Sequence, residues 1–169
     1  MKTLMMNFQG LLGVVIGGAI ALASAWGLDW WRQAREARNL AMAFRGEIVA
    51  LREIVKRRGY LKSLADAIEE IKRTSQPLIL HIPVRRQYFN VFDRNVDKIG
   101  MLNAPLPELL ATFYIQANAA LEDMESIREG IFSGDSEPLA GVYESLHALL
   151  EDTLSLGEKI ISEISRQYS

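Results

Sequence analysis

The chain has 169 residues, which is enough for one domain and too few for two of ordinary size. It contains no cysteine, so disulfide frameworks, cysteine–zinc sites and thiol catalysis are excluded. The formal net charge of −2 conceals a division: residues 32–58 hold eight Lys or Arg against three Asp or Glu, whereas residues 104–169 hold three against twelve. This asymmetry indicates either contact of the basic region with anionic lipid or pairing of basic with acidic helices.

An uncharged segment runs from Thr3 to Leu28. Within it, Phe8–Trp26 is a stretch of 19 residues, and as a helix it would be roughly 28 Å long, close to the thickness of a bilayer core. Its four glycines between positions 10 and 18 would make a poor helix in water, because each costs about 1 kcal/mol relative to alanine. We therefore predict a transmembrane anchor over residues 1–31.

Aromatic and basic residues flank the predicted span. Tryptophan prefers the headgroup boundary, because its ring is apolar while its N–H needs a hydrogen-bond partner. Membrane lipid is accordingly a predicted partner of this part of the chain. The residues predicted to lie at the membrane interface are Phe8, Trp26, Trp30, Trp31, Arg32, Arg35 and Arg38.

The charges on either side of the span predict its orientation. Lys2 precedes it, and a larger group of arginines follows it. Since Lys and Arg are kept on the cytoplasmic side, we predict a single-pass protein of the bacterial inner membrane with its C-terminal domain in the cytoplasm. The alternative is a cleaved signal peptide, because Ala21-Leu22-Ala23 and Ala23-Ser24-Ala25 both fit the cleavage rule. The length of the apolar stretch and its basic downstream flank argue against cleavage.

Small residues follow one stripe of the predicted span, and part of the stripe matches the G-x-x-x-G pattern. In lipid, helices associate where small side chains let their backbones approach closely. This pattern favours a homo-oligomer or a subunit of a larger membrane complex; the alternative is that glycine serves only as a small apolar filler. The residues predicted to mediate association are Gly10, Gly13, Gly17, Ala21 and Ser24.

The pattern of residues 32–169 predicts a helical bundle, so that the fold class is all-α. A helix should continue from Trp30 to Arg58 and end at Gly59, and a second should cover Tyr60–Ser75, ended by Pro77. The apolar stripe of the first helix steps by three or four residues and comprises Leu40, Phe44, Ile48, Leu51 and Val55.

The sequence pattern of the second half of the chain predicts three more helices. After an extended connector (Leu78–Val84), a short helix is expected over about residues 86–99, with Phe89, Phe92, Val96 and Ile99 inward. Pro105 and Pro107 should open a helix that reaches about Phe132, with Ile131 on its buried side. Ser136 or Asp135 should cap the last helix. Short connections between these helices predict an antiparallel bundle.

No pattern of catalytic or ligand-binding residues is present. Glu144 and His147 are one turn apart, as in di-iron bundles, but such a site needs a second pair, and His81 lies on the connector. Adjacent acidic residues at 122–125 point in different directions around a helix. The arginines of residues 32–58 accompany no aromatic platform for bases. We therefore expect no enzyme activity, no cofactor, no metal site and no nucleic-acid partner.

Two structural patterns resemble a known group of proteins. They are Phe92-x-x-Asn95-x-Asp97-Lys98-Ile99-Gly100-Met101-Leu102 and Pro107-Glu108-Leu109…Phe113-Tyr114. Together with the glycine-rich span and its Trp/Arg boundary, they make the chain similar to small uncharacterised bacterial proteins with one membrane anchor and a helical domain. The resemblance implies a bacterial origin and carries over no active site.

The predicted function is that of a non-enzymatic, membrane-anchored accessory or scaffold subunit. It would associate through the glycine-rich helix and present the helical domain as a docking surface. One alternative is an envelope factor with its domain outside the cytoplasm, such as a spanin-like phage lysis protein. Another is a helical bundle that senses a small ligand or a lipid.

Overall fold

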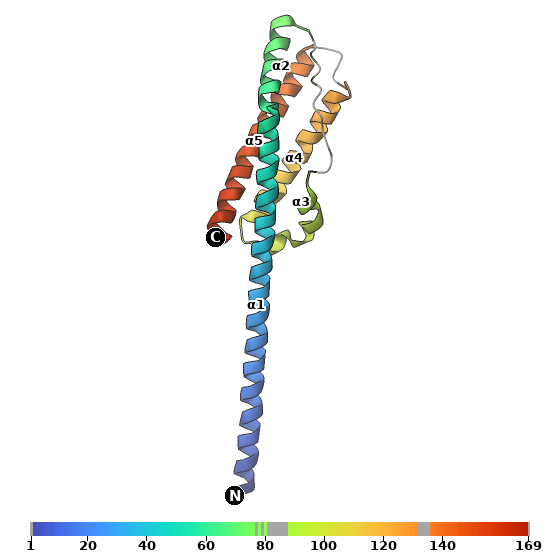
Figure 1. Ribbon diagram of the computed structural model, residues 1–169. Coiled ribbons are helices and arrows are strands. Elements are labelled where there is room, and N and C mark those ends of the chain that lie inside the picture. Colours follow the sequence, from blue (N-terminus) through green and yellow to red (C-terminus); the bar gives the residue numbers. More distant parts are fainter. Residues whose placement is uncertain (1, 77, 79, 81–87, 132–135, 169) are drawn as a thin grey trace. The chain divides into compact units, whose positions relative to one another are not determined.

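The computed structural model describes the backbone of residues 2–76, 78, 80, 88–131 and 136–168. It describes the side chains of the same residues except 2–23, 25 and 136–138. Every regular element in this described part is a helix (Figure 1), so the predicted all-α fold is confirmed there. The elements are α1 (Lys2–Arg58), α2 (Tyr60–Thr74), α3 (Asn90–Asn95), the 3-10 helix η1 (Val96–Met101), α4 (Leu106–Arg128) and α5 (Ser136–Tyr168).

The chain forms two compact units. The first comprises Met1–Asn39 and the second Leu40–Ser169. Helix α1 supplies residues to both units and ends where predicted, because Gly59 has a φ of 63°, a conformation that suits glycine. The predicted boundary between the membrane anchor (residues 1–31) and the helical domain (residues 32–169) marks the expected edge of the bilayer. It is not the boundary between the two compact units, and it stays a prediction.

Helices α4 and α5 of the second unit run antiparallel. Thr153 Oγ1 in α5 lies 3.4 Å from Gln116 Oε1 in α4. At the other end of the pair, the backbone amide of Asn103 donates a hydrogen bond of 3.1 Å to the hydroxyl of Tyr168. Later residues of α5 thus pair with earlier residues of α4, as the short connection between them predicts.

The main core of the second unit lies where α2, α4 and α5 meet. Each helix contributes apolar side chains spaced by three or four residues, which is the period used to predict it. Burial of each large aliphatic side chain contributes about 1.5–3 kcal/mol. The buried residues are Leu64, Ala67 and Ile71 from α2, Ala120, Met124 and Ile127 from α4, and Leu139, Ala140, Tyr143, Leu146 and Leu150 from α5.

A cluster of five aromatic rings joins α1, α3 and α4 within the same unit: Phe44, Phe89, Phe92, Phe113 and Tyr114. The rings of Phe92 and Tyr114 stack with their centroids 3.9 Å apart. Phe113 meets Tyr114 edge-on, with centroids 5.1 Å apart and an interplanar angle of 90°. Aromatic pairs in such arrangements are worth about 0.5–1.5 kcal/mol beyond their buried area.

The carboxylate of Glu47 in α1 connects the start of α3 to Tyr114 of this cluster through hydrogen bonds. Its Oε1 accepts a hydrogen bond of 2.6 Å from the backbone amide of Val91. Its Oε2 accepts one of 3.1 Å from the amide of Phe92 and one of 2.6 Å from the hydroxyl of Tyr114. Helix α3 has no local side-chain cap, so a residue distant in sequence satisfies two of its first amides.

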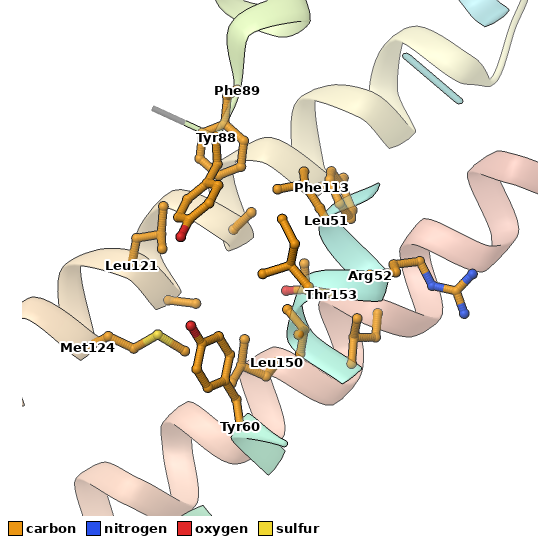
Figure 2. A pocket seen from close by; sticks show the side chains of 15 residues that line it. Leu51, Arg52, Tyr60, Tyr88, Phe89, Phe113, Leu121, Met124, Leu150 and Thr153 are labelled. Atoms are coloured by element: carbon orange, nitrogen blue, oxygen red, sulfur yellow. The ribbon is translucent and has the colours of Figure 1, made fainter. Parts of the chain in front are cut away.

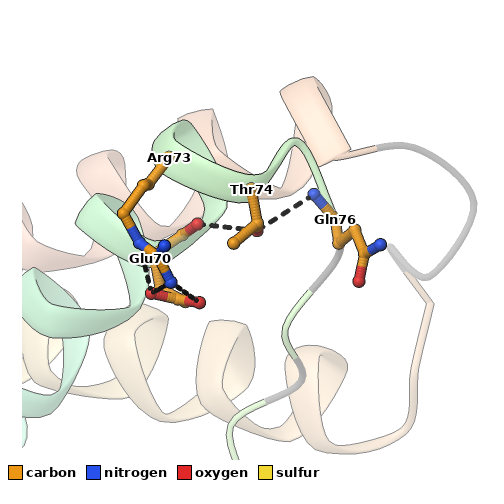
Figure 3. A network of polar contacts seen from close by, with 4 residues as sticks. All are labelled: Glu70, Arg73, Thr74 and Gln76. Atoms are coloured by element: carbon orange, nitrogen blue, oxygen red, sulfur yellow. Dashed lines mark hydrogen bonds and ion pairs between the residues drawn. The ribbon is translucent and has the colours of Figure 1, made fainter.

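Helix α2 ends in a network of polar contacts (Figure 3). Thr74 Oγ1 donates to the carbonyl oxygen of Glu70 at 2.8 Å and accepts from the amide of Gln76 at 3.3 Å. Arg73 Nη2 lies 2.7 Å from a carboxylate oxygen of Glu70. Ser75 follows with a φ of 53°. The helix therefore ends one residue earlier than predicted, at a left-handed residue.

Two residues of the predicted extended connector are described, and both contact Tyr143 of α5. The Tyr143 hydroxyl donates to the carbonyl oxygen of Leu78 at 2.8 Å and accepts from the amide of Leu80 at 3.1 Å. Neither Leu78 nor Leu80 lies in a helix or strand. Pro77, predicted to end α2, and His81 lie outside the described residues.

The single helix predicted over residues 86–99 is wrong in its bounds. The chain forms α3 over Asn90–Asn95 and then changes to the 3-10 helix η1. Phe89 and Ile99 are buried as predicted, but Val96 is 54% exposed. Val96 is the first residue of the 3-10 helix, which has 3.0 residues per turn instead of 3.6. The apolar stripe predicted for an α-helix therefore no longer faces the core at this residue.

Helix α4 begins at the predicted prolines but ends at Arg128, about four residues early. Gly130 has a φ of 74°. Its amide donates a hydrogen bond to the carbonyl oxygen of Ile127, and the amide of Ile131 donates one to the carbonyl oxygen of Ser126. This pair of bonds is a Schellman motif, which ends a helix at a glycine. Ile131 lies beyond it and is 64% exposed, so its predicted burial is wrong.

Side chains of α1 and α4 lie close to Gly157 of α5. An added Cβ would lie 3.1 Å from Arg52 Cδ, 3.1 Å from Phe113 Cε2 and 3.2 Å from Ile48 Cγ2. A Cβ could be accommodated here only if these side chains shifted by a few tenths of an ångström. Glycine also has a lower intrinsic helix propensity than alanine, so it weakens α5 at this position.

Candidate functional site

The predicted interface tryptophans lie in the first unit and are exposed. Trp26, Trp30 and Trp31 are 81%, 73% and 56% exposed, and Leu28 between them is 56% exposed. A tryptophan carries a large apolar surface and is highly buried on average in soluble proteins. Four large apolar side chains are therefore exposed around one short stretch of α1, which favours an apolar or interfacial environment.

Basic residues follow the tryptophans on the same helix. Arg32, Arg35 and Arg38 are exposed. The guanidinium carbon of Arg35 lies 5.3 Å from the centroid of the Trp31 ring, which is within the range of a cation–π contact. An apolar ring beside an exposed cation is the arrangement found at the boundary between lipid and water.

The predicted association stripe falls mainly outside the described side chains. The backbone of α1 is helical at Phe8 and at each position of the stripe. Side chains are undescribed for Phe8, Gly10, Gly13, Gly17 and Ala21, whereas Ser24 is described and exposed.

Among the residues with described side chains, no helix is long and apolar enough to cross a membrane. The predicted span from Phe8 to Trp26 lies almost wholly outside those residues.

A small apolar cavity lies inside the second unit, between α1, α4 and α5 (Figure 2). Its volume is about 70 Å³. Aliphatic and aromatic side chains form most of its wall, including Leu51, Phe113, Leu121 and Leu150. Pockets that hold drug-sized ligands have volumes of about 300–1,000 Å³. The cavity is too small for such a ligand and corresponds to a gap in packing between helices.

Two tyrosines bring polar atoms to this cavity. Figure 2 shows the hydroxyl groups of Tyr60 and Tyr88 directed toward its interior. The Tyr60 hydroxyl accepts a hydrogen bond of 2.7 Å from Arg58 Nη1, which is the main cause of a raised pKa at Arg58. The Tyr88 hydroxyl oxygen is buried and has no partner with good hydrogen-bond geometry among the described residues, although Tyr88 also contributes to the raised pKa of Arg58.

The acidic and histidine residues weighed as metal ligands are dispersed or paired with cations. Glu144 Oε1 lies 2.5 Å from Lys72 Nζ, and His147 Nδ1 lies 3.5 Å from Glu151 Oε2. Burial raises the pKa of Asp123, with a further contribution from its neighbour Glu122. Within the described part of the chain, no three His, Asp or Glu side chains gather as a metal site would require.

The polar interaction that sequence reasoning missed is the one between Glu47 and Tyr114. Burial raises the pKa of Tyr114 above its ordinary value of 10.0, and the hydrogen bond to Glu47 adds to the effect. Glu47 lies beside the apolar stripe of α1, where a carboxylate normally faces water. Its partners are 44 to 67 residues away in sequence, so no local pattern could have identified them.

No protein-family model matches the chain, and neither does any curated protein or any solved structure. What the chain does is therefore inferred from its own residues.

Proposed function

We propose that the chain is a membrane-anchored accessory or scaffold subunit without enzyme activity. The uncharged part of α1 crosses the bilayer, and the second unit is a helical docking domain at the membrane surface. The observation that carries this proposal is the exposure of Trp26, Trp30 and Trp31 at the end of the uncharged segment. At a bilayer interface the same side chains would contact acyl chains and headgroups, which suits both their rings and their N–H groups.

The predicted orientation belongs to the same proposal. The basic flank after the span favours a second unit in the cytoplasm, with the N-terminus outside. A reporter fused after Ser169 tests this directly. Fluorescence of a green fluorescent protein fusion is expected, and activity of an alkaline phosphatase fusion would instead favour an envelope-facing factor.

Charge substitution tests the anchor with a matched control. Val15 is central in the predicted span, so Val15→Arg would place a charge in the bilayer core at a cost of about 2.5–3.5 kcal/mol. Ile115→Arg is the control, because Ile115 is 69% exposed on α4. We expect the native chain and Ile115→Arg to stay in membranes washed with alkaline carbonate, and a large fraction of Val15→Arg to be released. Equal retention of the two variants, or release of the native chain, would refute the anchor.

Association through the glycine stripe is the second part of the proposal. Gly13→Leu would separate two helices that pack over glycine, whereas Val15→Leu changes the opposite side of the helix. We expect cross-linked oligomers of the full chain in membranes to decrease for Gly13→Leu and to persist for Val15→Leu. A chain that is monomeric in both variants and in the native form would contradict self-association.

A further inference from the structure

A second hollow in the second unit is larger than the apolar cavity and more polar. It has a volume of about 410 Å³ and lies at the corner between α1 and α2, with one residue of α5 completing it. This volume is within the range of small-molecule sites. We call it the corner groove. Its wall is formed by Val49, Arg52, Glu53, Val55, Lys56, Gly59, Leu61, Lys62 and Leu154.

The charged groups of the corner groove leave two cations unmatched. Arg52 forms an ion pair with Glu158, and Glu53 lies 3.3 Å from Arg57. Lys56 and Lys62 are exposed and form no ion pair or hydrogen bond with any residue that the structure describes. The groove therefore has an excess of positive charge, and an anion is the complementary ligand.

Lys62 occupies a position where a cation is unfavourable within the fold. It lies in the first turn of α2, at the positive end of the helix dipole. This turn contains no acidic residue, and Gly59 provides no side-chain cap. Lys56, in contrast, lies in the last turn of α1, where the dipole favours a positive charge. The fold thus explains Lys56 but not Lys62, whereas an anion in the groove would stabilise both.

The chemical type of the unmatched cations favours phosphate over carboxylate. Planar carboxylates are best matched by the fork of an arginine, but Arg52 and Arg57 are already paired with glutamates. The two unmatched cations are lysines, which act as point charges and commonly bind phosphate. The first backbone amides of α2, the helix to which Lys62 belongs, carry partial positive charge.

The other wall of the corner groove is apolar. Val55 and Leu154 line both the corner groove and the adjacent 70 Å³ cavity, as does the stem of Arg52. The Nε atom of Arg52 is buried and has no hydrogen-bond partner among the described residues. A ligand with a short apolar portion beside its phosphate would cover this wall.

We propose that the corner groove binds a phosphate-bearing amphiphile, with the phosphate held by Lys56 and Lys62 and the apolar portion against Val55 and Leu154. This inference concerns the second unit alone and goes beyond the proposed anchoring. The phosphate could belong to a lipid headgroup or to a soluble phosphate ester, and the probes below distinguish these sources.

The test is calorimetric titration of the full chain in a neutral detergent with two probes, dihexanoyl phosphatidic acid and inorganic phosphate. Lys62→Gln is expected to weaken saturable binding about tenfold, since a hydrogen bond to a charged group is lost. Lys98→Gln, an equal change of net charge on exposed η1 away from the groove, should bind like the native chain. Circular dichroism would verify that both variants are folded.

The two probes assign the source of the phosphate. Tighter binding of dihexanoyl phosphatidic acid than of inorganic phosphate supports the amphiphile, whereas equal binding would refute the apolar contact with Val55 and Leu154. Absence of saturable binding by either probe would overturn the proposal. It would also be overturned if Lys62→Gln and Lys98→Gln reduced affinity equally, because binding would then be a non-specific effect of charge.

Discussion

Single residues at contacts between helices decide how the second unit packs, and Gly157 is the clearest case. The structure places Ile48, Arg52 and Phe113 around the position that a Cβ of this residue would occupy. A requirement of this kind depends on which helices meet, and no periodicity within α5 contains that information.

Alanine substitution at two glycines of α5 tests this contact. Gly157→Ala adds a methyl group 3.1–3.2 Å from three side chains, so we expect it to destabilise the protein by about 1–3 kcal/mol. Gly141→Ala meets nothing within 4 Å and should stabilise α5 by up to about 1 kcal/mol. Urea unfolding of the full chain in detergent would measure both. Similar effects of the two substitutions would show that Gly157 is not a packing contact.

Tyr114 is expected to make stability depend on alkaline pH. Its pKa is raised in the folded protein by burial and by Glu47, so the neutral phenol favours folding. This contribution is fully present below the unfolded pKa of about 10 and is lost as the pH rises above it. Tyr114→Phe should therefore cost about 1.5–3 kcal/mol at neutral pH, since the carboxylate of Glu47 loses a donor.

The same substitution should also reduce the loss of stability at alkaline pH. Unfolding free energies of the native chain and Tyr114→Phe, measured from pH 8 to pH 11, should converge as the pH rises above about 10. Glu69→Gln provides a control, because Glu69 is an exposed glutamate of α2. A constant difference between the native chain and Tyr114→Phe across this range would contradict the assignment.

At the scale of helices, the sequence predicted which segments are helical better than where they end. Gly59 and the prolines at the start of α4 were identified, because glycine and proline have strong local preferences. The end of α2 was predicted to within one residue, whereas the end of α4 at Gly130 was missed. Ser75 adopts a left-handed conformation that its residue type does not indicate, and Gly130 was followed by an apolar residue in the predicted phase.

The helix end at Ser75 predicts a stabilising substitution. Its φ of 53° is unfavourable for a residue with a Cβ, so Ser75→Gly should raise stability by about 0.5–1 kcal/mol. Ser145→Gly is the control within α5, where an exposed helical position should lose a few tenths of a kcal/mol. Thermal unfolding of both variants measures the difference. A loss of stability at Ser75→Gly would show that the serine makes a contact worth more than its strain.

Interactions between distant elements were the least predictable part of the candidate sites. The boundary of tryptophans and arginines could be predicted because its residues are neighbours in the sequence. The corner groove depends on Gly59 bringing the end of α1 beside the start of α2, and on Leu154 of α5 completing its wall. The sequence shows Lys56 and Lys62 as members of a basic run and does not show that they share a hollow.

At the scale of the whole molecule, pairing within the fold accounts for part of the charge asymmetry of the sequence. Arg52 of the basic region 32–58 forms an ion pair with Glu158 of the acidic region 104–169. Arg32, Arg35 and Arg38 of the first unit are exposed. In the proposed anchored state each would attract anionic headgroups by about 1 kcal/mol near the membrane surface.

The central claim is that the N-terminal part of α1 resides in lipid, and tryptophan fluorescence measures it most directly. The chain contains three tryptophans, Trp26, Trp30 and Trp31, so the whole emission reports on the proposed interface. In vesicles containing brominated acyl chains, the full chain should show blue-shifted emission that the bromine quenches. Emission at the wavelength of tryptophan in water, with no quenching by brominated lipid, would contradict the claim.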